Sequence, residues 1–148
     1  MKYQKIDSNL FIKNRKNFLG RMKPNSIAFF NSNDIYPVSA DSTLPFEQHR
    51  DIFYLSGVDQ EESVLMLCPS CSDQNLREVL FLKETDEHIA VWEGPKLNKK
   101  QAFETSGIKS VFWLDEMENI IDKVMNECET IYYNHNEHYR AKVEMETR

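Results

Sequence analysis

Several features that mark specialised classes of protein are scarce or missing in this sequence. Its 4 glycines are isolated from one another, so it has no glycine-rich loop of the kind that cradles phosphate groups. It contains no apolar run long enough to span a membrane as a helix. Its 24 acidic residues outnumber its 18 basic ones, which argues against nucleic acid as the main partner, because phosphate binding needs clustered Lys and Arg.

Cysteine is also scarce. There are 3 cysteines, and the N-terminus lacks the apolar core of an export signal, so we expect a reducing compartment and a cytoplasmic protein. Cys68 and Cys71 have the spacing of a zinc knuckle or a redox pair. A structural zinc usually needs a second such pair, and Cys128 stands alone. The alternative is a buried Cys68 that ends a strand, with Cys71 in a turn.

What the sequence does contain is typical of one soluble globular domain. Apolar residues make up 41% of the chain and charged residues 28%. A chain of 148 residues can bury roughly 70% of the surface that its unfolded form exposes, so a hydrophobic core is possible. We therefore interpret residues 1–148 as a single domain without repeats or linkers.

Apolar runs with helical and strand periods alternate along the chain. The helical patterns predict helices at 8–22, 98–105, 115–125 and 138–148. The short apolar runs predict strands at 26–30, 52–55, 63–68, 78–83, 88–92, 111–114 and 130–133, and a hairpin joining 78–83 to 88–92. The long connection over 31–48 has no period, and such connections are often functional. Together these patterns predict an α/β fold, a mixed sheet with helices on its faces.

Two stretches carry a resemblance to a known family. Gln48, Asp51, Tyr54 and Gly57 stand at the spacing Gln-x-x-Asp-x-x-Tyr-x-x-Gly, and residues 91–97 read Val-Trp-Glu-Gly-Pro-Lys-Leu. These motifs, in this order, resemble the N-terminal domain of Xaa-Pro aminopeptidases (aminopeptidase P), which is of the creatinase and prolidase N-terminal type. The resemblance covers nearly the whole chain.

The resemblance implies a fold and a function. The fold would be a three-layer α/β/α unit around a mixed sheet of about six strands. The chain would be the non-catalytic N-terminal domain of a metal-dependent enzyme that hydrolyses the bond between an N-terminal residue and proline. Two divalent metal ions, usually manganese, would lie in a catalytic domain C-terminal to residue 148 and activate a water there. We therefore expect no catalytic residue and no metal ligand in this chain, and no activity from it alone.

The same resemblance implies two substrate-binding residues, Trp92 and Asp41. In the family, the N-terminal domain of one subunit reaches the active site of another, so we expect a homo-oligomer that acts on peptides with proline at the second position. A Trp beside a Gly can stack its ring on a prolyl ring, and a carboxylate can hold a peptide amine. The alternatives are a core role for Trp92 and a turn-forming role for Asp41.

Three departures from the family pattern concern charge. Val38, Glu47 and Pro95 stand where the family usually has Arg, with Lys96 following Pro95. Each loses a guanidinium that could pair with a carboxylate, and Lys is not equivalent to Arg at such a site. Two other functions stay open: the same domain of a prolidase or creatinase-like hydrolase, or a non-catalytic module that binds peptides or proteins.

Two histidine clusters are weaker candidates. His135 and His138 would share one helix face as metal ligands, but no third ligand is evident, and a helix cap on a solvated surface is the alternative. His49, Arg50 and Asp51 could suggest acid–base chemistry, but no nucleophile motif accompanies them.

Overall fold

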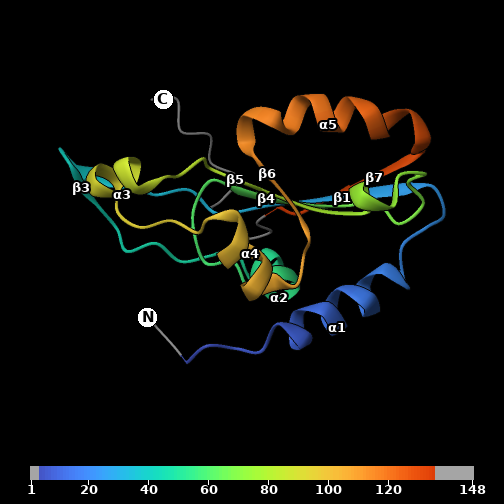
Figure 1. Cartoon of the computed structure of the whole chain (residues 1–148), viewed down its shortest axis with the longest axis horizontal. Helices are drawn as coiled ribbons and strands as arrows, with labels where there is room; N and C mark the ends of the chain where they lie inside the picture. Colours follow the sequence, from blue (N-terminus) through green and yellow to red (C-terminus); the bar gives the residue numbers. More distant parts are fainter. Residues whose placement is uncertain (1–3, 136–148) are drawn as a thin grey trace.

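The computed structural model describes residues 4–135, and a five-stranded mixed sheet forms its centre (Figure 1). In spatial order the strands are β6 (Ser110–Trp113), β5 (Glu78–Leu82), β4 (Ser63–Leu67), β1 (Ser26–Asn31) and β7 (Thr130–Tyr133). Each outer strand is parallel to its neighbour: β6 to β5, and β7 to β1. The central strand β4 is antiparallel to both β1 and β5.

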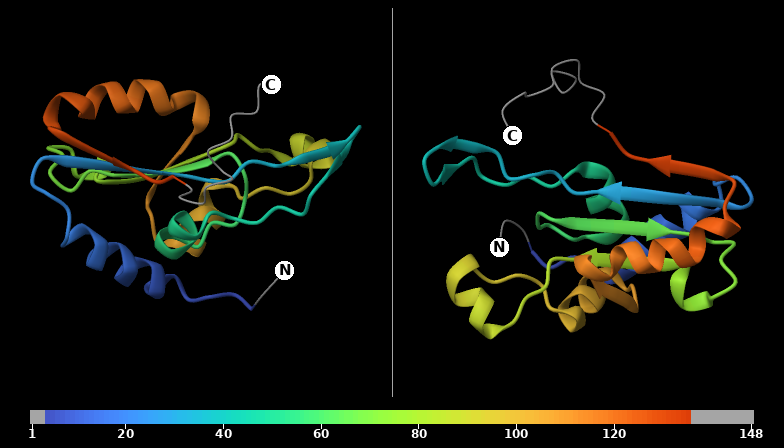
Figure 2. Two further views of the ribbon diagram at one scale, coloured as in Figure 1. Left: turned by 180° about the vertical axis from the view of Figure 1, so that it is seen from behind. Right: turned by 90° about the horizontal axis from the view of Figure 1, so that it is seen from above.

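Helices cover both faces of the sheet, which confirms the three-layer α/β/α architecture (Figures 1 and 2). One face carries α1 (Ser8–Leu19), α2 (Arg50–Ser56) and α4 (Lys99–Ser106). The other carries α5 (Met117–Val124), flanked by the short 3-10 turns η2 (Leu114–Glu116) and η3 (Met125–Glu127). A further turn, η1 (Gln74–Leu76), precedes β5. No helix within residues 4–135 is both long enough and apolar enough to cross a membrane.

Alternation along the strands divides the core into two layers. In β4, Leu65 and Leu67 belong to the core cluster on the α1–α2–α4 side, while Met66 belongs to the cluster on the α5 side. Leu80 and Phe81 of β5 divide in the same way, as the two-residue period of a strand requires. A sheet covered on both faces explains why its strands read as continuous apolar runs in the sequence.

A single buried guanidinium, that of Arg15 in α1, ties two helices together. Its side chain is 1% exposed, and its Nε donates to Glu78 Oε1 at 2.7 Å. Its Nη1 donates to the backbone oxygens of Leu55 and Ser106, each at 2.8 Å. Those oxygens belong to the last turns of α2 and α4, where carbonyl groups lack partners within the helix. Arg15 therefore completes both helix ends at once.

The two helix ends that Arg15 joins are built alike. Each ends in a Ser-Gly pair, and the glycines, Gly57 and Gly107, have φ angles of 70° and 76°. Side chains from α1 fill the space that a Cβ would occupy: Phe11 at Gly57 and Ile12 at Gly107. Glycine is needed at both positions, because its backbone turns left-handed and no side chain would fit beneath α1.

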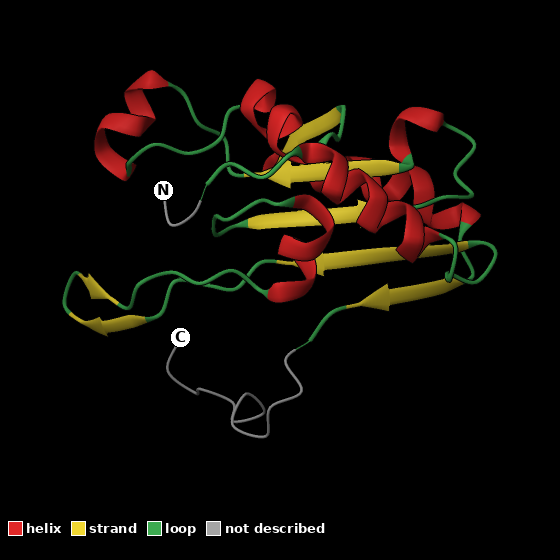
Figure 3. Cartoon of the chain, turned by 90° about the horizontal axis from the view of Figure 1, so that it is seen from below, coloured by secondary structure: helices red, strands yellow, loops and turns green. Residues whose placement is uncertain are grey.

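Two elements project from the same end of the sheet (Figures 2 and 3). The hairpin of β2 (Pro37–Ser39) and β3 (Ser42–Thr43) follows β1, inside the connection that the sequence leaves without period. The short helix α3 (Glu87–Glu93) follows β5. Neither the hairpin strands nor α3 contain a buried residue.

Two of the predicted strands are helices. Residues 52–55 lie in α2, where the His49 side chain accepts a hydrogen bond from the Asp51 amide and Gly57 ends the helix. Residues 88–92 lie in α3, which begins when Asp86 accepts from the Ile89 amide. A run of four or five apolar residues does not distinguish a strand from a short helix. In both segments a capping side chain before the run starts a helix. The predicted hairpin over 78–92 is therefore wrong, and the sheet has five strands instead of about six.

The remaining elements follow the sequence prediction closely. Helix α4 begins at Asn98 with a capping box to Gln101 and ends at Gly107, as predicted. Helix α1 is shorter than predicted, because it is capped by Asp7 and stops at Leu19 before Gly20. The helix predicted for 138–148 lies outside the described residues.

Candidate functional site

Trp92 is the most exposed large apolar side chain of the described residues. It is 81% exposed on α3, and its neighbour Val91 is 78% exposed. Helix α3 buries none of its own residues within this domain. The structure therefore rules out a core role for Trp92 here and presents its ring to solvent at the projecting end of the sheet.

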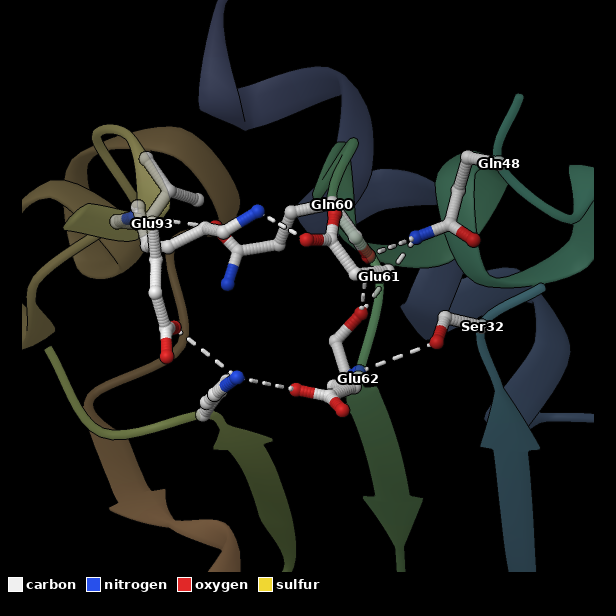
Figure 4. A network of polar contacts seen from close by, with 10 residues as sticks. Ser32, Gln48, Gln60, Glu61, Glu62 and Glu93 are labelled. Carbon is white, nitrogen blue, oxygen red and sulfur yellow. Dashed lines mark hydrogen bonds and ion pairs between the residues drawn. The ribbon is translucent and has the colours of Figure 1, made fainter. Parts of the chain in front are cut away.

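Ion pairs fasten the C-terminal end of α3 to the sheet. The Lys83 ammonium, just beyond β5, lies 3.0 Å from the Glu93 carboxylate and 3.2 Å from that of Glu62. Figure 4 shows Glu93 and Glu62 converging on this ammonium from two segments. Hydrogen bonds to Glu93 and Glu62 raise the pKa of Lys83 and outweigh its desolvation. Because all three groups are partly exposed, the pairs orient α3 more than they stabilise it.

Asp41 lies in the two-residue turn between β2 and β3. Ser39 and Ser42 are paired across that turn, and Ala40 has a positive φ of 47°. The place of Asp41 fits a turn-forming residue, and its side chain is exposed, so it is also available to a partner. The elements that carry Asp41 and Trp92, the β2–β3 hairpin and α3, form separate projections in Figures 2 and 3.

Gln48 holds together the base of the hairpin. Its Nε2 donates to the backbone oxygens of Val58 at 3.0 Å and Gln60 at 2.9 Å. Its Oε1 accepts from the backbone amides of His49 at 2.8 Å and Asn33 at 3.3 Å. One amide thus joins the two ends of the hairpin connection to the segment before β4, and Figure 4 shows its nitrogen directed toward the Gln60 segment. Sequence reasoning used Gln48 only as part of a motif, because its partners are defined by the fold.

A pocket of about 480 Å³ opens between the roots of the two projections. Glu61 and Lys96 form an ion pair on its wall and are 13% and 15% exposed. Burial pushes the pKa of Glu61 upward, but the hydrogen bond and positive charge of Lys96 outweigh it, and the pKa is lowered overall. The pocket is lined by Phe46, Asp59, Gln60, Glu61, Pro95, Lys96, Leu97 and Gln101.

Gln60 is the unusual residue of this pocket. Its Oε1 accepts from the Leu97 amide at 3.0 Å, which joins the segment before β4 to the segment before α4 (Figure 4). Its Nε2 is the only fully buried side-chain nitrogen or oxygen of the described residues that has no hydrogen-bond partner. An unpaired buried donor is destabilising by about 1–3 kcal/mol, so this amide nitrogen adds no stability to the free domain.

The other candidates have structural roles or different neighbours than expected. His49 serves as the cap of α2. His135 lies near Tyr133, with ring centroids 6.3 Å apart, and His138 is outside the described residues. Cys68 is buried directly after β4, close to the alternative in which it ends a strand, and the Cys128 sulfur lies 3.5 Å from that of Cys68. No group of three or more His, Cys, Asp or Glu side chains within residues 4–135 is placed to hold a metal ion.

Comparison with known proteins adds information that geometry does not give. The family described as "Aminopeptidase P, N-terminal domain" matches residues 11–132. A curated relative, Xaa-Pro aminopeptidase from Escherichia coli, is 28% identical over 138 residues, which cover 93% of this chain and 31% of the relative. The chain thus spans less than a third of that relative's length.

Solved structures share the fold. Aminopeptidase PepP from Pseudomonas aeruginosa superposes with a TM-score of 0.81 at 24% identity, over 91% of this chain and 30% of that one. Zinc-substituted Escherichia coli aminopeptidase P in complex with product superposes with a TM-score of 0.78 at 27% identity, over 93% of this chain and 31% of that one. In both structures the matching part is about a third of the chain.

Proposed function

We propose a function from one premise: this chain belongs to the family of aminopeptidase P N-terminal domains. It serves as the non-catalytic N-terminal domain of an Xaa-Pro aminopeptidase, an enzyme that hydrolyses the bond between an N-terminal residue and proline. Within that enzyme the domain shapes the substrate cleft and a subunit interface. The whole protein is a cytoplasmic homo-oligomer in this proposal.

The metal chemistry belongs elsewhere in the whole protein. A relative has been solved in zinc-substituted form, which supports a metal-dependent enzyme. The side chains within residues 4–135 do not fit such a centre, since no three potential ligands converge. In the proposal the two divalent ions, manganese by preference, are held by residues that follow this domain, and no step of the reaction passes through Trp92 or Asp41 as a ligand.

The exposure of Trp92 is the observation that carries the proposal. A tryptophan side chain can bury 150–250 Å² of surface, roughly, and a ring that is 81% exposed leaves most of it in water. Exposed apolar surface on a projecting element is typical of a site that another molecule covers. A prolyl ring of a peptide substrate is the partner that this apolar face accepts best.

Asp41 gives the second projection a negative charge. At the hairpin turn its carboxylate is exposed and can hold the amine of a peptide or a guanidinium of a neighbouring subunit. The three positions without the family's Arg lie on the same two projections or between them: Val38 is in β2, Glu47 follows the hairpin, and Pro95 lines the pocket. An arginine that could pair with a carboxylate is therefore absent at three positions on the side of the domain that, in this proposal, faces a partner.

The test uses the complete protein loaded with manganese. We expect Trp92→Ala to lower kcat/KM for peptides with proline at the second position by about tenfold or more, because burying a large apolar side chain is worth about 1.5–3 kcal/mol. The neighbouring Val91→Ala, 78% exposed on the same helix, is the matched control and should leave kcat/KM unchanged. Equal kcat/KM for wild type and Trp92→Ala would remove Trp92 from the site.

The same assay separates the alternative functions. Turnover of dipeptides ending in proline, with longer peptides untouched, would indicate a prolidase-like enzyme. No turnover of any such peptide by the complete protein would indicate a non-catalytic binding module. The 148-residue chain alone should release no N-terminal residue even with added manganese, and turnover by it would contradict the proposal.

A further inference from the structure

Thiols that are far apart in the sequence meet beneath helix α5. Cys68 directly follows β4, and Cys128 lies between η3 and β7. Their sulfur atoms are 3.5 Å apart, and the Cys128 sulfur is also 3.5 Å from the Val124 backbone oxygen. Both belong to the apolar cluster on the α5 side of the sheet, together with Cys71. Among the described residues all three cysteines are free thiols.

We propose that Cys68 and Cys128 form a reversible disulfide that joins the end of β4 to the start of the edge strand β7. A disulfide brings its sulfurs to about 2.05 Å, and the two sulfurs already lie within 3.5 Å of each other. Cys128 is partly exposed, whereas Cys68 and Cys71 are 0% and 1% exposed. An oxidant in solution therefore reaches Cys128 first.

The reaction balances with a low-molecular-weight disulfide, RSSR, as the oxidant. The Cys128 thiolate attacks one sulfur of RSSR, forms a mixed disulfide and expels RS⁻. The Cys68 thiol gives its proton to the expelled RS⁻ and attacks the Cys128 sulfur, which expels the second RS⁻. That thiolate takes the proton that Cys128 released to water. Two protein thiols and one RSSR become one protein disulfide and two RSH, and two electrons pass to the oxidant.

The order of the two steps follows from the surroundings of Cys68. Burial and the neighbouring thiols of Cys128 and Cys71 raise the pKa of Cys68 to about 12. The thiolate is the nucleophile in disulfide exchange, so Cys68 is unreactive toward an external oxidant at neutral pH. Cys68 therefore reacts only after the adjacent Cys128 sulfur has become part of the mixed disulfide.

The cross-link restrains an edge of the sheet. Strand β7 is hydrogen-bonded to β1 on one side and to no strand on the other within the described residues. The disulfide would close a loop between positions 60 residues apart. Closing a loop of this length removes conformational freedom from the unfolded chain and should raise Tm by on the order of 10 °C.

The test oxidises the purified chain with excess oxidised glutathione, alkylates the remaining thiols under denaturing conditions and maps tryptic peptides by mass. We expect two of the three thiols to resist alkylation, a covalent link to the Cys128 peptide, and a rise in Tm that dithiothreitol reverses. Trypsin leaves Cys68 and Cys71 on one peptide, because no Lys or Arg separates them. Cys71→Ser assigns the link, since it should keep the cross-link and the rise in Tm, whereas Cys128→Ser should lose both.

Three results would overturn the proposal. They are a link between Cys68 and Cys71, a lasting glutathione adduct on Cys128 with Cys68 still free, or alkylation of all three thiols after oxidation. Cys71→Ala replaces Cys71→Ser if the serine variant does not fold, because alanine leaves no polar group in the apolar cluster. The assay uses no peptidase substrate, so its outcome is independent of the proposed enzymatic function.

Discussion

Arg15 and Gln60 are both buried polar side chains, but their surroundings satisfy their hydrogen-bonding groups to different extents. Beneath α1, the Arg15 guanidinium finds a carboxylate and two helix-terminal carbonyls at 2.7–2.8 Å. At the pocket, the Gln60 amide makes one hydrogen bond through its oxygen and leaves its nitrogen without a partner. The first arrangement is complete within the domain. The second contains a donor without a partner among the described residues.

The comparison teaches where stability and binding capacity reside. A buried charge is tolerated only when it is fully paired, so the Arg15 region must hold its geometry for the domain to fold. A buried donor without a partner destabilises the free domain and becomes favourable when an acceptor reaches it. We therefore expect substitutions beneath α1 to change the free energy of unfolding most, and substitutions at the pocket to change it least.

The largest expected effect is that of Arg15→Met. It keeps much of the side-chain volume but leaves the backbone oxygens of Leu55 and Ser106 without a donor inside the core. We expect a loss of about 3 kcal/mol in the free energy of unfolding, measured by urea denaturation. Lys13→Met, on the exposed side of α1, should stay within about 0.5 kcal/mol of wild type. Equal stability of the two variants would contradict the anchoring role of Arg15.

A smaller loss is expected for Gln48→Met. Its amide has four backbone partners, so the substitution leaves the oxygens of Val58 and Gln60 and two amides without their bonds. Water can reach some of these groups, since Gln48 is only partly buried, and we expect a loss of about 2 kcal/mol by the same urea measurement. The hydrogen exchange of the His49 and Asn33 amides, which donate to Gln48 Oε1, should also accelerate. Unchanged exchange there would show that the base of the hairpin does not depend on Gln48.

Gln60→Met sharpens the comparison, because it makes the same chemical change at an amide that lacks a partner. It removes the unpaired Nε2 together with one hydrogen bond from the Leu97 amide. These two effects oppose each other, and we expect the free energy of unfolding to stay within about 1 kcal/mol of wild type. A loss as large as that of Gln48→Met would mean that the amide nitrogen of Gln60 is satisfied in solution.

The smallest effect concerns pH. The pKa of Glu61 is lowered in the folded chain, so its pair with Lys96 stabilises the protein above the unfolded pKa, which is about 4.3 for glutamate. That contribution is lost as the pH falls through the lower folded pKa. Between pH 7 and pH 3 the free energy of unfolding should therefore fall less for Glu61→Gln than for wild type. The difference between the two falls should be under about 1 kcal/mol. Urea denaturation at both pH values measures the two losses, and equal losses for wild type and Glu61→Gln would contradict a stabilising role of the ion pair.

The sequence predicted the sheet better than the helices beside it. Runs such as residues 63–68 and 78–83 are apolar because both faces of their strands are covered, and they were assigned correctly as β4 and β5. Helix α4 was also predictable, because Asn98 and Gly107 mark its ends. Helices α2 and α3 were not, since each is a single short apolar run whose caps are His49 and Asp86, residues with many other roles.

The candidate site was predictable only where a motif carried it. Trp92 and Asp41 came from the family resemblance, and they lie in α3 and in the turn between β2 and β3, where their role stays a prediction. Gln60 carries no local signal, because its importance depends on the absence of a partner in the folded chain. The pairing of Cys128 with Cys68 depends on β7 returning to lie beside β1, a contact between distant segments that no spacing rule reveals.

The shared anchor of α2 and α4 has a mechanical consequence. Along the chain the hairpin is followed by α2, and α3 is followed by α4. The Arg15 guanidinium joins the C-terminal ends of these two helices. Arg15 therefore fixes α2 and α4 relative to each other, although it lies in neither projection. Any force that a partner exerts on both projections and that reaches these helices would converge on this one side chain.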